Sequence, residues 1–187
     1  MVPRLAMIPQ TLQPDRNLIL TGYIQPNQPR IGRQVAQKLG RRFVDVEELI
    51  EERMGDRPEA IRAQFGERHL KAVEDEVLDT VVLMRSAVIR INGSTLATTE
   101  RRERLMANAE TLCLVARLDA ILQRLHLALG ARYHNTAERG AALGHLRREW
   151  AVRKIAGVVE MDVTYMSDPA IVNEIVAWWQ VVALARG

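Results

Sequence analysis

Hydrophobic and polar positions along the chain form two alternating kinds of segment. Apolar residues three and four apart predict helices, and several of these helices end at glycines such as Gly40 and Gly55. Short apolar runs typical of buried strands lie at residues 17–20, 42–45, 87–91, 111–115 and 158–163. Strands that alternate with helices form a parallel sheet with helices on both faces. The pattern therefore predicts a three-layer α/β fold with a five-stranded parallel sheet flanked by helices.

The helical period also sets the expected bounds of the helices. We expect the region of residues 58–84 to be helical, because its apolar positions give an apolar face at helical spacing. Ser167 followed by Asp168 and Pro169 is typical of a helix start, and it predicts the last helix. The other predicted helices cover residues 31–39, 46–54, 100–106 and 118–129. The turn of residues 92–94 is expected to follow the third strand.

Length and composition favour a single domain. The chain has 187 residues, of which 48% are hydrophobic, enough for one well-packed core. Residues 1–16 contain three prolines and no sustained period, which predicts a mobile N-terminal arm before a domain at 17–187. No stretch approaches the roughly 18 to 20 apolar residues of a membrane span. We therefore expect a cytoplasmic protein without a membrane partner.

Charge and cysteine usage exclude several classes of site. The 26 basic and 23 acidic residues leave a net charge of only +3, so a nucleic-acid partner is not expected. Cys113 is the single cysteine, and it lies in an apolar run, which excludes an intramolecular disulfide and a cysteine-rich metal site. The four histidines are far apart in the sequence and lack ligand spacing. No metal site is predicted.

The segment between the first strand and the first helix occupies the place of a phosphate-binding loop. Such loops follow the pattern G-x-x-x-x-G-K-S/T, in which backbone N–H groups, the lysine and the hydroxyl bind phosphate and magnesium. Counted from Gly22, the second glycine is Asn27, the lysine is Gln28 and the hydroxyl residue is Pro29. Losing three charge-assisted hydrogen bonds weakens binding on the order of a thousandfold or more. Ordinary ATP binding is not expected, and no cofactor is predicted.

The order of motifs resembles the shikimate kinases, a P-loop family with the nucleoside monophosphate kinase fold. The resemblance runs from about residue 17 to residue 179 and includes the altered loop, the run Phe43-Val44-Asp45-Val46-Glu47 and the turn at 92–94. Its most specific part is the family pattern I-F-x-x-x-G-E-x-x-F-R-x-x-E, in which Gly66-Glu67 and Glu74 fall at the right offsets. The resemblance implies a three-layer P-loop kinase-like fold and a phosphotransferase ancestry.

The resemblance also implies candidate site residues. Asp45 and Glu47 match the family's aspartate pair, one near magnesium and one on the hydroxyls of shikimate. Lys71 matches the arginine that binds the shikimate carboxylate, and Gly93 is the middle residue of the glycine turn beside the substrate. Arg132 lies where the lid supplies an arginine to the transferring phosphoryl group. Asp45 and Arg132 are thus the catalytic candidates, and Glu47, Lys71 and Gly93 the substrate-binding ones.

Several of these positions depart from the family pattern. Glu47 adds a methylene that displaces its oxygens by about 1 Å, an error that can cost about a hundredfold in rate. Lys71 keeps a charge but loses the bidentate fork of arginine. Asn92 and Ser94 replace the outer glycines of the turn, and Trp150 aligns with a second carboxylate-binding arginine. Most of the alterations are unfavourable for shikimate phosphorylation.

Three hypotheses follow. The leading one is a shikimate kinase-like protein that has lost the kinase reaction and serves a binding, regulatory or assembly role, with an unknown protein partner or a small anionic ligand. The second is an active small-molecule kinase or ligand-binding enzyme with a rebuilt phosphate site, in which Arg30 or Lys71 supplies the charge that Gln28 lacks. Gly22, Gln28 and Arg30 are its nucleotide-binding candidates, and Mg and ATP are required. The third, from the basic residues at 147–154, is an RNA or acidic-protein binder, although a solvated helix face is the commoner explanation. Trp178-Trp179 makes a homodimer possible, although a core face explains the pair equally well.

Overall fold

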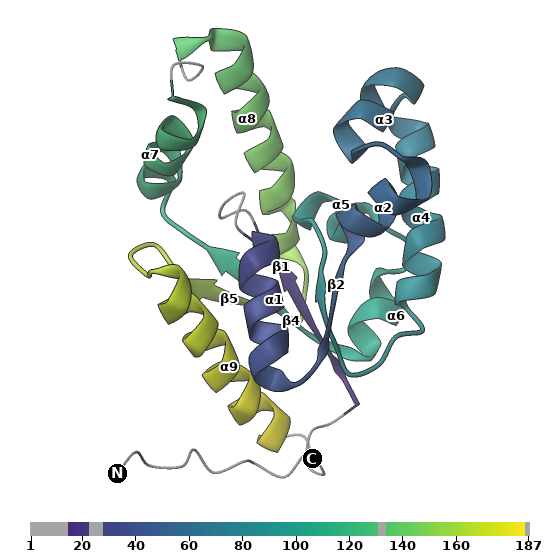
Figure 1. Cartoon of the computed structure of the whole chain (residues 1–187), viewed down its shortest axis with the longest axis vertical. Helices are drawn as coiled ribbons and strands as arrows, with labels where there is room; N and C mark the ends of the chain where they lie inside the picture. Colours follow the sequence, from purple (N-terminus) through teal and green to yellow (C-terminus); the bar gives the residue numbers. More distant parts are fainter. Residues whose placement is uncertain (1–14, 23–27, 131–133, 186–187) are drawn as a thin grey trace.

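The computed structural model describes residues 15–22, 28–130 and 134–185. Its centre is one sheet of five strands in the order β2-β3-β1-β4-β5, with every neighbouring pair parallel (Figure 1). The strands are β1 (Asn17–Thr21), β2 (Arg42–Asp45), β3 (Ala87–Arg90), β4 (Ala109–Val115) and β5 (Val158–Asp162). The α/β class and the five-stranded parallel sheet predicted from the sequence are confirmed.

Helices cover both faces of this sheet (Figure 1). One face packs against α1 (Gln28–Leu39) and α9 (Asp168–Ala185). The other carries α2 (Val46–Met54), α3 (Pro58–Phe65), α4 (Glu67–Val81), α5 (Gly93–Thr98), α6 (Arg102–Ala107) and the 3-10 helix η3 (Trp150–Lys154). Two further helices, α7 (Leu118–Leu129) and α8 (Thr136–Glu149), connect β4 to η3. Among the described residues, no helix is long and apolar enough to cross a membrane.

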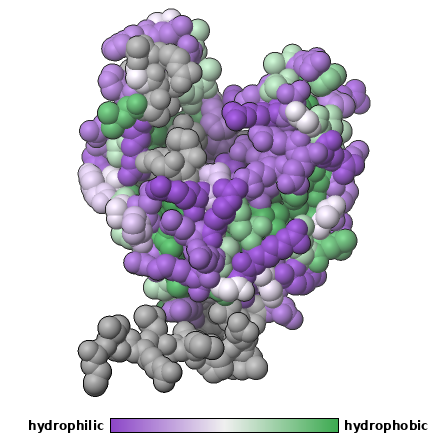
Figure 2. Space-filling model, in the orientation of Figure 1, coloured by the Kyte–Doolittle hydropathy of each residue, from purple (hydrophilic) through white to green (hydrophobic). Residues whose placement is uncertain are grey.

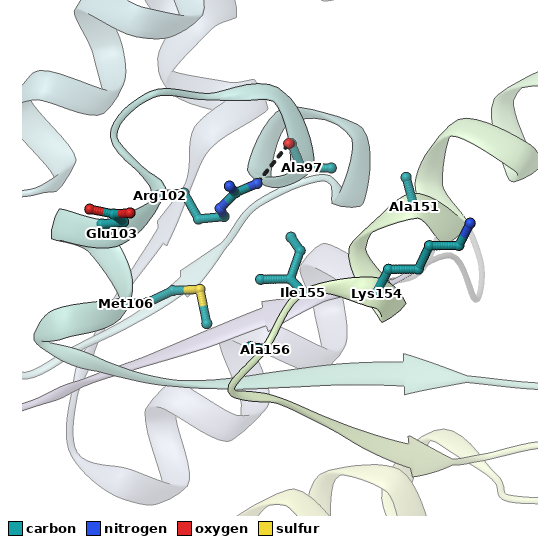
Figure 3. Close-up of a pocket in the computed structure, with 8 residues that line it drawn as sticks. All are labelled: Ala97, Arg102, Glu103, Met106, Ala151, Lys154, Ile155 and Ala156. Atoms are coloured by element: carbon teal, nitrogen blue, oxygen red, sulfur yellow. Dashed lines mark hydrogen bonds between the residues drawn. The ribbon is translucent and has the colours of Figure 1, made fainter.

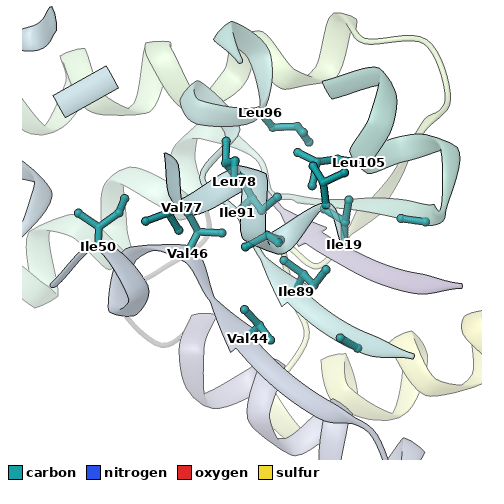
Figure 4. Packing of buried hydrophobic residues seen from close by; sticks show 14 of the residues in the cluster. Ile19, Val44, Val46, Ile50, Val77, Leu78, Ile89, Ile91, Leu96 and Leu105 are labelled. Carbon is teal, nitrogen blue, oxygen red and sulfur yellow. The ribbon is translucent and has the colours of Figure 1, made fainter. Parts of the chain in front are cut away.

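The strands place alternate side chains in two separate cores, as the period of a pleated strand requires. Leu18 and Leu20 of β1 pack toward α1 and α9, whereas Ile19 between them joins the opposite cluster. Figure 4 shows this second cluster, in which Ile19 and Ile89 lie near Leu105. The inner strands β1, β3 and β4 are buried almost throughout, which explains why they read as apolar runs, whereas the edge strand β5 is mostly exposed.

The region expected to be helical over residues 58–84 consists of two helices, α3 and α4, of which the second ends at Val81. The chain breaks at Gly66, whose φ of 86° ends α3 and begins α4 at a new angle. Glycine adopts this backbone conformation without the steric cost that a Cβ imposes. Phe65 continues the helical period in sequence, but 53% of it is exposed, so it does not extend the apolar face.

The segment after β3 also differs from the prediction. Residues 92–94 do not form a simple turn, because α5 begins at Gly93. The helix expected at 100–106 is α6, which runs from Arg102 to Ala107. The six residues of α5 include two threonines and a glycine, which have low helix propensity, so its formation depends on tertiary contacts such as the burial of Leu96. The predicted arm lies outside the described residues except for Asp15 and Arg16, and Arg132 lies outside them too.

Candidate functional site

The carboxyl ends of β2 and β3 form the centre of the candidate site. Asp45 ends β2 and accepts a hydrogen bond from the Glu47 backbone N–H at 3.0 Å, which caps α2. This cap places both carboxylates at one edge of the sheet, where the Asp45 side chain is 1% exposed and that of Glu47 is 29% exposed. The two candidates that the sequence singled out are therefore neighbours, at the edge where parallel α/β sheets bind ligands.

Arg90 of β3 fills the space between these carboxylates. It is the register partner of Asp45, and its side chain is 11% exposed. Its Nη1 donates to the two carboxylate oxygens of Asp45 at 2.9 and 3.1 Å and to Oε2 of Glu47 at 2.8 Å. One guanidinium nitrogen thus contacts both of the carboxylates that were expected to face magnesium and substrate.

Asn92 completes a closed network around Arg90. Its side-chain oxygen accepts from Nη2 of Arg90 at 3.2 Å, and its amide donates to Oε1 of Glu47. Asn92, which replaces a glycine of the family's turn beside the substrate, therefore binds other side chains of the protein. The sequence offered one signal for Arg90, a single charge inside the apolar run of residues 87–91, and our sequence analysis missed it.

Burial has the largest effect on the pKa of each charged group in this network. It raises the pKa of Asp45, and the opposing attraction of Arg90 does not reverse that increase. Burial also acts to raise the pKa of Glu47, but the attraction of Arg90 and the hydrogen bond from Asn92 outweigh it, so the net pKa is lowered. The two carboxylates in turn outweigh burial at Arg90 and raise its pKa. The guanidinium thus stays charged and is held mainly by an ionised Glu47.

These contacts do not fit a magnesium ion at Asp45 and Glu47. Mg²⁺ requires oxygen ligands in near-octahedral geometry. Here both oxygens of Asp45 and Oε2 of Glu47 already accept hydrogen bonds from Arg90, and Oε1 of Glu47 accepts one from the Asn92 amide. Elsewhere within the described ranges, no group of three or more histidine, cysteine or carboxylate side chains is arranged to hold a metal ion.

A second buried carboxylate, Glu149, holds the start of α5. It is 2% exposed and accepts hydrogen bonds from the Gly93 backbone N–H and, at 2.6 Å, from the Ser94 hydroxyl. A Cβ on Gly93 would overlap the backbone carbonyl of Glu149. The structure thus gives Gly93 a packing role against the end of α8, and its predicted role toward substrate remains a prediction. Sequence reasoning also missed Glu149.

The nucleotide-binding candidates lie in sequence on both sides of residues 23–27, which include Asn27 and are outside the described part of the chain. Gly22 follows β1 with a φ of 102°, and a Cβ there would overlap the carbonyl of Leu114 in β4. Gln28 is the first residue of α1. The guanidinium of Arg30 pairs with Asp168 at the start of α9, and its side chain is 62% exposed. Gly22 therefore has a structural reason to be glycine, and the guanidinium of Arg30 has a partner in Asp168.

Lys71 lies on the exposed side of α4. A cavity of about 190 Å³ between α3–α4 and α5–η3 is lined by Glu74 and Arg148 but not by Lys71. Glu74 accepts a hydrogen bond from the Thr95 hydroxyl at 3.1 Å, and burial raises the pKa of Glu74.

Figure 2 shows the surface hollowed between the projecting ends of α3 and α8, with predominantly hydrophilic residues around the hollow. The structure thus brings Asp45 and Glu47 together and leaves Lys71 outside this cavity.

Comparison with known proteins gives one consistent family. A sequence model described as shikimate kinase matches residues 29–180. Shikimate kinases of Thermodesulfovibrio yellowstonii and Geobacter metallireducens are each 32% identical to this chain over 110 residues, or 59% of it. The alignments cover 64% and 62% of these relatives, so the chain matches less than two thirds of their length.

Solved structures agree on the fold. A shikimate kinase from Acinetobacter baumannii, described in complex with shikimate, has a TM-score of 0.74 and 19% identity, over 92% of this chain and 97% of its own. The enzyme from Bacteroides thetaiotaomicron has a TM-score of 0.72 and 20% identity, over 89% and 97%. The match over residues 29–180 covers well over half of the sequence. On that match, the chain belongs to the shikimate kinase family.

Proposed function

We propose that this member of the shikimate kinase family has lost ATP-dependent phosphorylation of shikimate and keeps the fold for a binding or regulatory role. The observation that carries the proposal is the position of Arg90 between Asp45 and Glu47. A guanidinium there satisfies the carboxylates and repels a divalent cation approaching the same oxygens. Phosphoryl transfer depends on metal ions that bridge the phosphates and neutralise developing charge, so a site closed in this way lacks that contribution.

The altered phosphate loop supports the same conclusion independently. Gln28 and Pro29 stand where the loop pattern has a lysine and a hydroxyl residue. Arg30 could replace the missing lysine in a rebuilt site, but its guanidinium pairs with Asp168. The loop thus lacks the lysine that would bind phosphate, and the carboxylate site already holds the guanidinium of Arg90. Both changes oppose binding of a magnesium nucleotide.

A direct assay of phosphoryl transfer from labelled Mg-ATP to shikimate tests this proposal. We expect no product above the level of the Asp45→Asn variant, which removes the carboxylate charge at the centre of the site. Glu48→Gln is the matched control, since Glu48 lies on α2, the helix that Asp45 caps, and pairs with Arg33 outside the network. Turnover that Asp45→Asn abolishes and Glu48→Gln preserves would overturn the proposal.

A further inference from the structure

A second cavity of about 670 Å³, which shares Ala97 and Ala151 with the cavity of about 190 Å³, opens beside α6 and η3 (Figure 3). Cavities of this size are typical of sites for small molecules. We call it the α6–η3 groove, and it is lined chiefly by Ala97, Arg102, Met106, Ala151, Lys154 and Ile155. Asp45, Glu47 and Arg90 do not line it, so it is distinct from the closed carboxylate network.

The groove has an apolar floor. Figure 3 shows Met106 of α6 and Ile155, which follows η3, pointing toward a common space, with small alanines on the walls. A thioether contacts aromatic rings favourably, and the flexible methionine side chain adapts to the shape of a ligand. The floor therefore suits a flat apolar group.

Positive charge lies on two sides of this floor. Arg102 donates from Nη1 to the Ala97 carbonyl at 2.9 Å, the one hydrogen bond that its guanidinium makes to the described residues. This bond fixes the planar fork above Ile155 (Figure 3). Lys154 lies at the opposite edge, where Figure 3 shows its ammonium pointing away from Arg102 and Ile155, and no ion pair joins it to a described residue. Glu103 also borders the groove, but Figure 3 shows its carboxylate apart from the pair of Arg102 and Ile155.

We propose that the α6–η3 groove binds a small aromatic monocarboxylate. The carboxylate accepts hydrogen bonds from the Arg102 fork, the ring lies on Met106 and Ile155, and Lys154 adds positive charge at the rim. The single net positive charge of the lining, from two cations and Glu103, matches a monoanion. This binding does not depend on whether the chain phosphorylates shikimate, because the groove shares no residue with the carboxylate network.

Titration with benzoate, followed by amide NMR shifts of the full chain, tests the proposal. We expect saturable shifts centred on Ala97, Met106 and Ile155. Benzyl alcohol, which lacks the charge, and acetate, which lacks the ring, should each bind at least about tenfold more weakly. Shifts elsewhere, or equal binding of the three compounds, would overturn the proposal.

Substitutions locate the binding within the groove. Arg102→Gln should weaken benzoate binding about tenfold or more, whereas Arg104→Gln, on the same helix but outside the lining, should leave it unchanged. Lys154→Gln should weaken binding roughly twofold, as expected for an exposed charge. Full affinity in Arg102→Gln would contradict the assignment.

A steric variant keeps the test decisive even if Arg102→Gln disturbs the end of α5. Ala151 is exposed and lines the groove, so Ala151→Leu fills the space without altering the core. It should abolish the benzoate shifts, while Ala141→Leu, at an exposed position of α8, should retain them. Unchanged binding in a folded Ala151→Leu protein would overturn the proposal.

Discussion

Arg90 and Arg102 occupy opposite situations in the molecule. Arg90 is nearly buried and binds two carboxylates and an amide of its own chain. Arg102 makes a single hydrogen bond to a carbonyl within the described residues and borders an open groove. A cation held by internal anions is not available to a ligand, whereas a cation fixed in place without an anion is. The comparison assigns stability to the first site and ligand binding to the second.

Energetics explain why the two sites cannot exchange roles. Removing charges from water costs several kcal/mol per ion, and only close, well-directed contacts recover that cost. Arg90 makes four close contacts, three from Nη1 and one from Nη2, which hold the network closed, while its buried Nε has no hydrogen-bond partner among the described residues. Arg102 remains partly hydrated, so a carboxylate ligand displaces water at a modest cost.

The largest loss of folding stability is expected from Arg90→Ala. This change leaves the buried Asp45 carboxylate and Glu47 without their cation, and breaking a buried pair in this way costs about 3–5 kcal/mol. Urea denaturation at neutral pH measures the loss. Arg104→Ala is the matched control, because Arg104 is exposed and its ion pair with Asp79 is weak, with 4.0 Å between the charged atoms. This variant should change stability by less than about 0.5 kcal/mol. Equal stability of the two variants would refute the closed network.

An intermediate effect is expected from Gly93→Ala. The new methyl group would overlap the Glu149 backbone, and such overpacking costs about 1–3 kcal/mol. Gly140→Ala, at an exposed position of α8 with open space around it, should be neutral or stabilising. Thermal denaturation of the two variants separates the cases. A neutral Gly93→Ala would mean that Gly93 is free to approach a ligand, as the family resemblance implies.

The smallest effect on stability is expected at Glu74, a half-buried carboxylate that accepts a hydrogen bond from the Thr95 hydroxyl. Burial raises the pKa of Glu74, so its ionised form destabilises the folded state above that pKa. Glu74→Gln should therefore increase stability at neutral pH, by less than about 1 kcal/mol. The difference should disappear as the pH falls through the folded-state pKa, because Glu74 is then protonated. A difference that persists in acid would show that its origin is not ionisation.

The sequence predicted the features that depend on local pattern and missed those that join distant residues. Buried parallel strands read as apolar runs, so the sheet was predicted, whereas Phe65 fitted a helical period that Gly66 interrupts in space. Asp45 and Glu47 were identified from the family resemblance, in which they match the aspartate pair. Their partner Arg90 lies 43 to 45 residues away, and Glu149 lies 56 residues from Gly93. The contacts of Arg90 depend on the register of β2 against β3, and those of Glu149 depend on the packing of α8 on α5. Neither can be predicted from a local sequence pattern.

Calorimetric titration of the wild-type protein with Mg-ATP up to millimolar concentration, with and without shikimate, tests the central claim most directly. A carboxylate site closed by Arg90 and a loop with Gln28 and Pro29 in place of lysine and hydroxyl predict no saturable heat in either titration. Saturable binding of Mg-ATP that shikimate strengthens would contradict the account and would mean that the chain still assembles a kinase site.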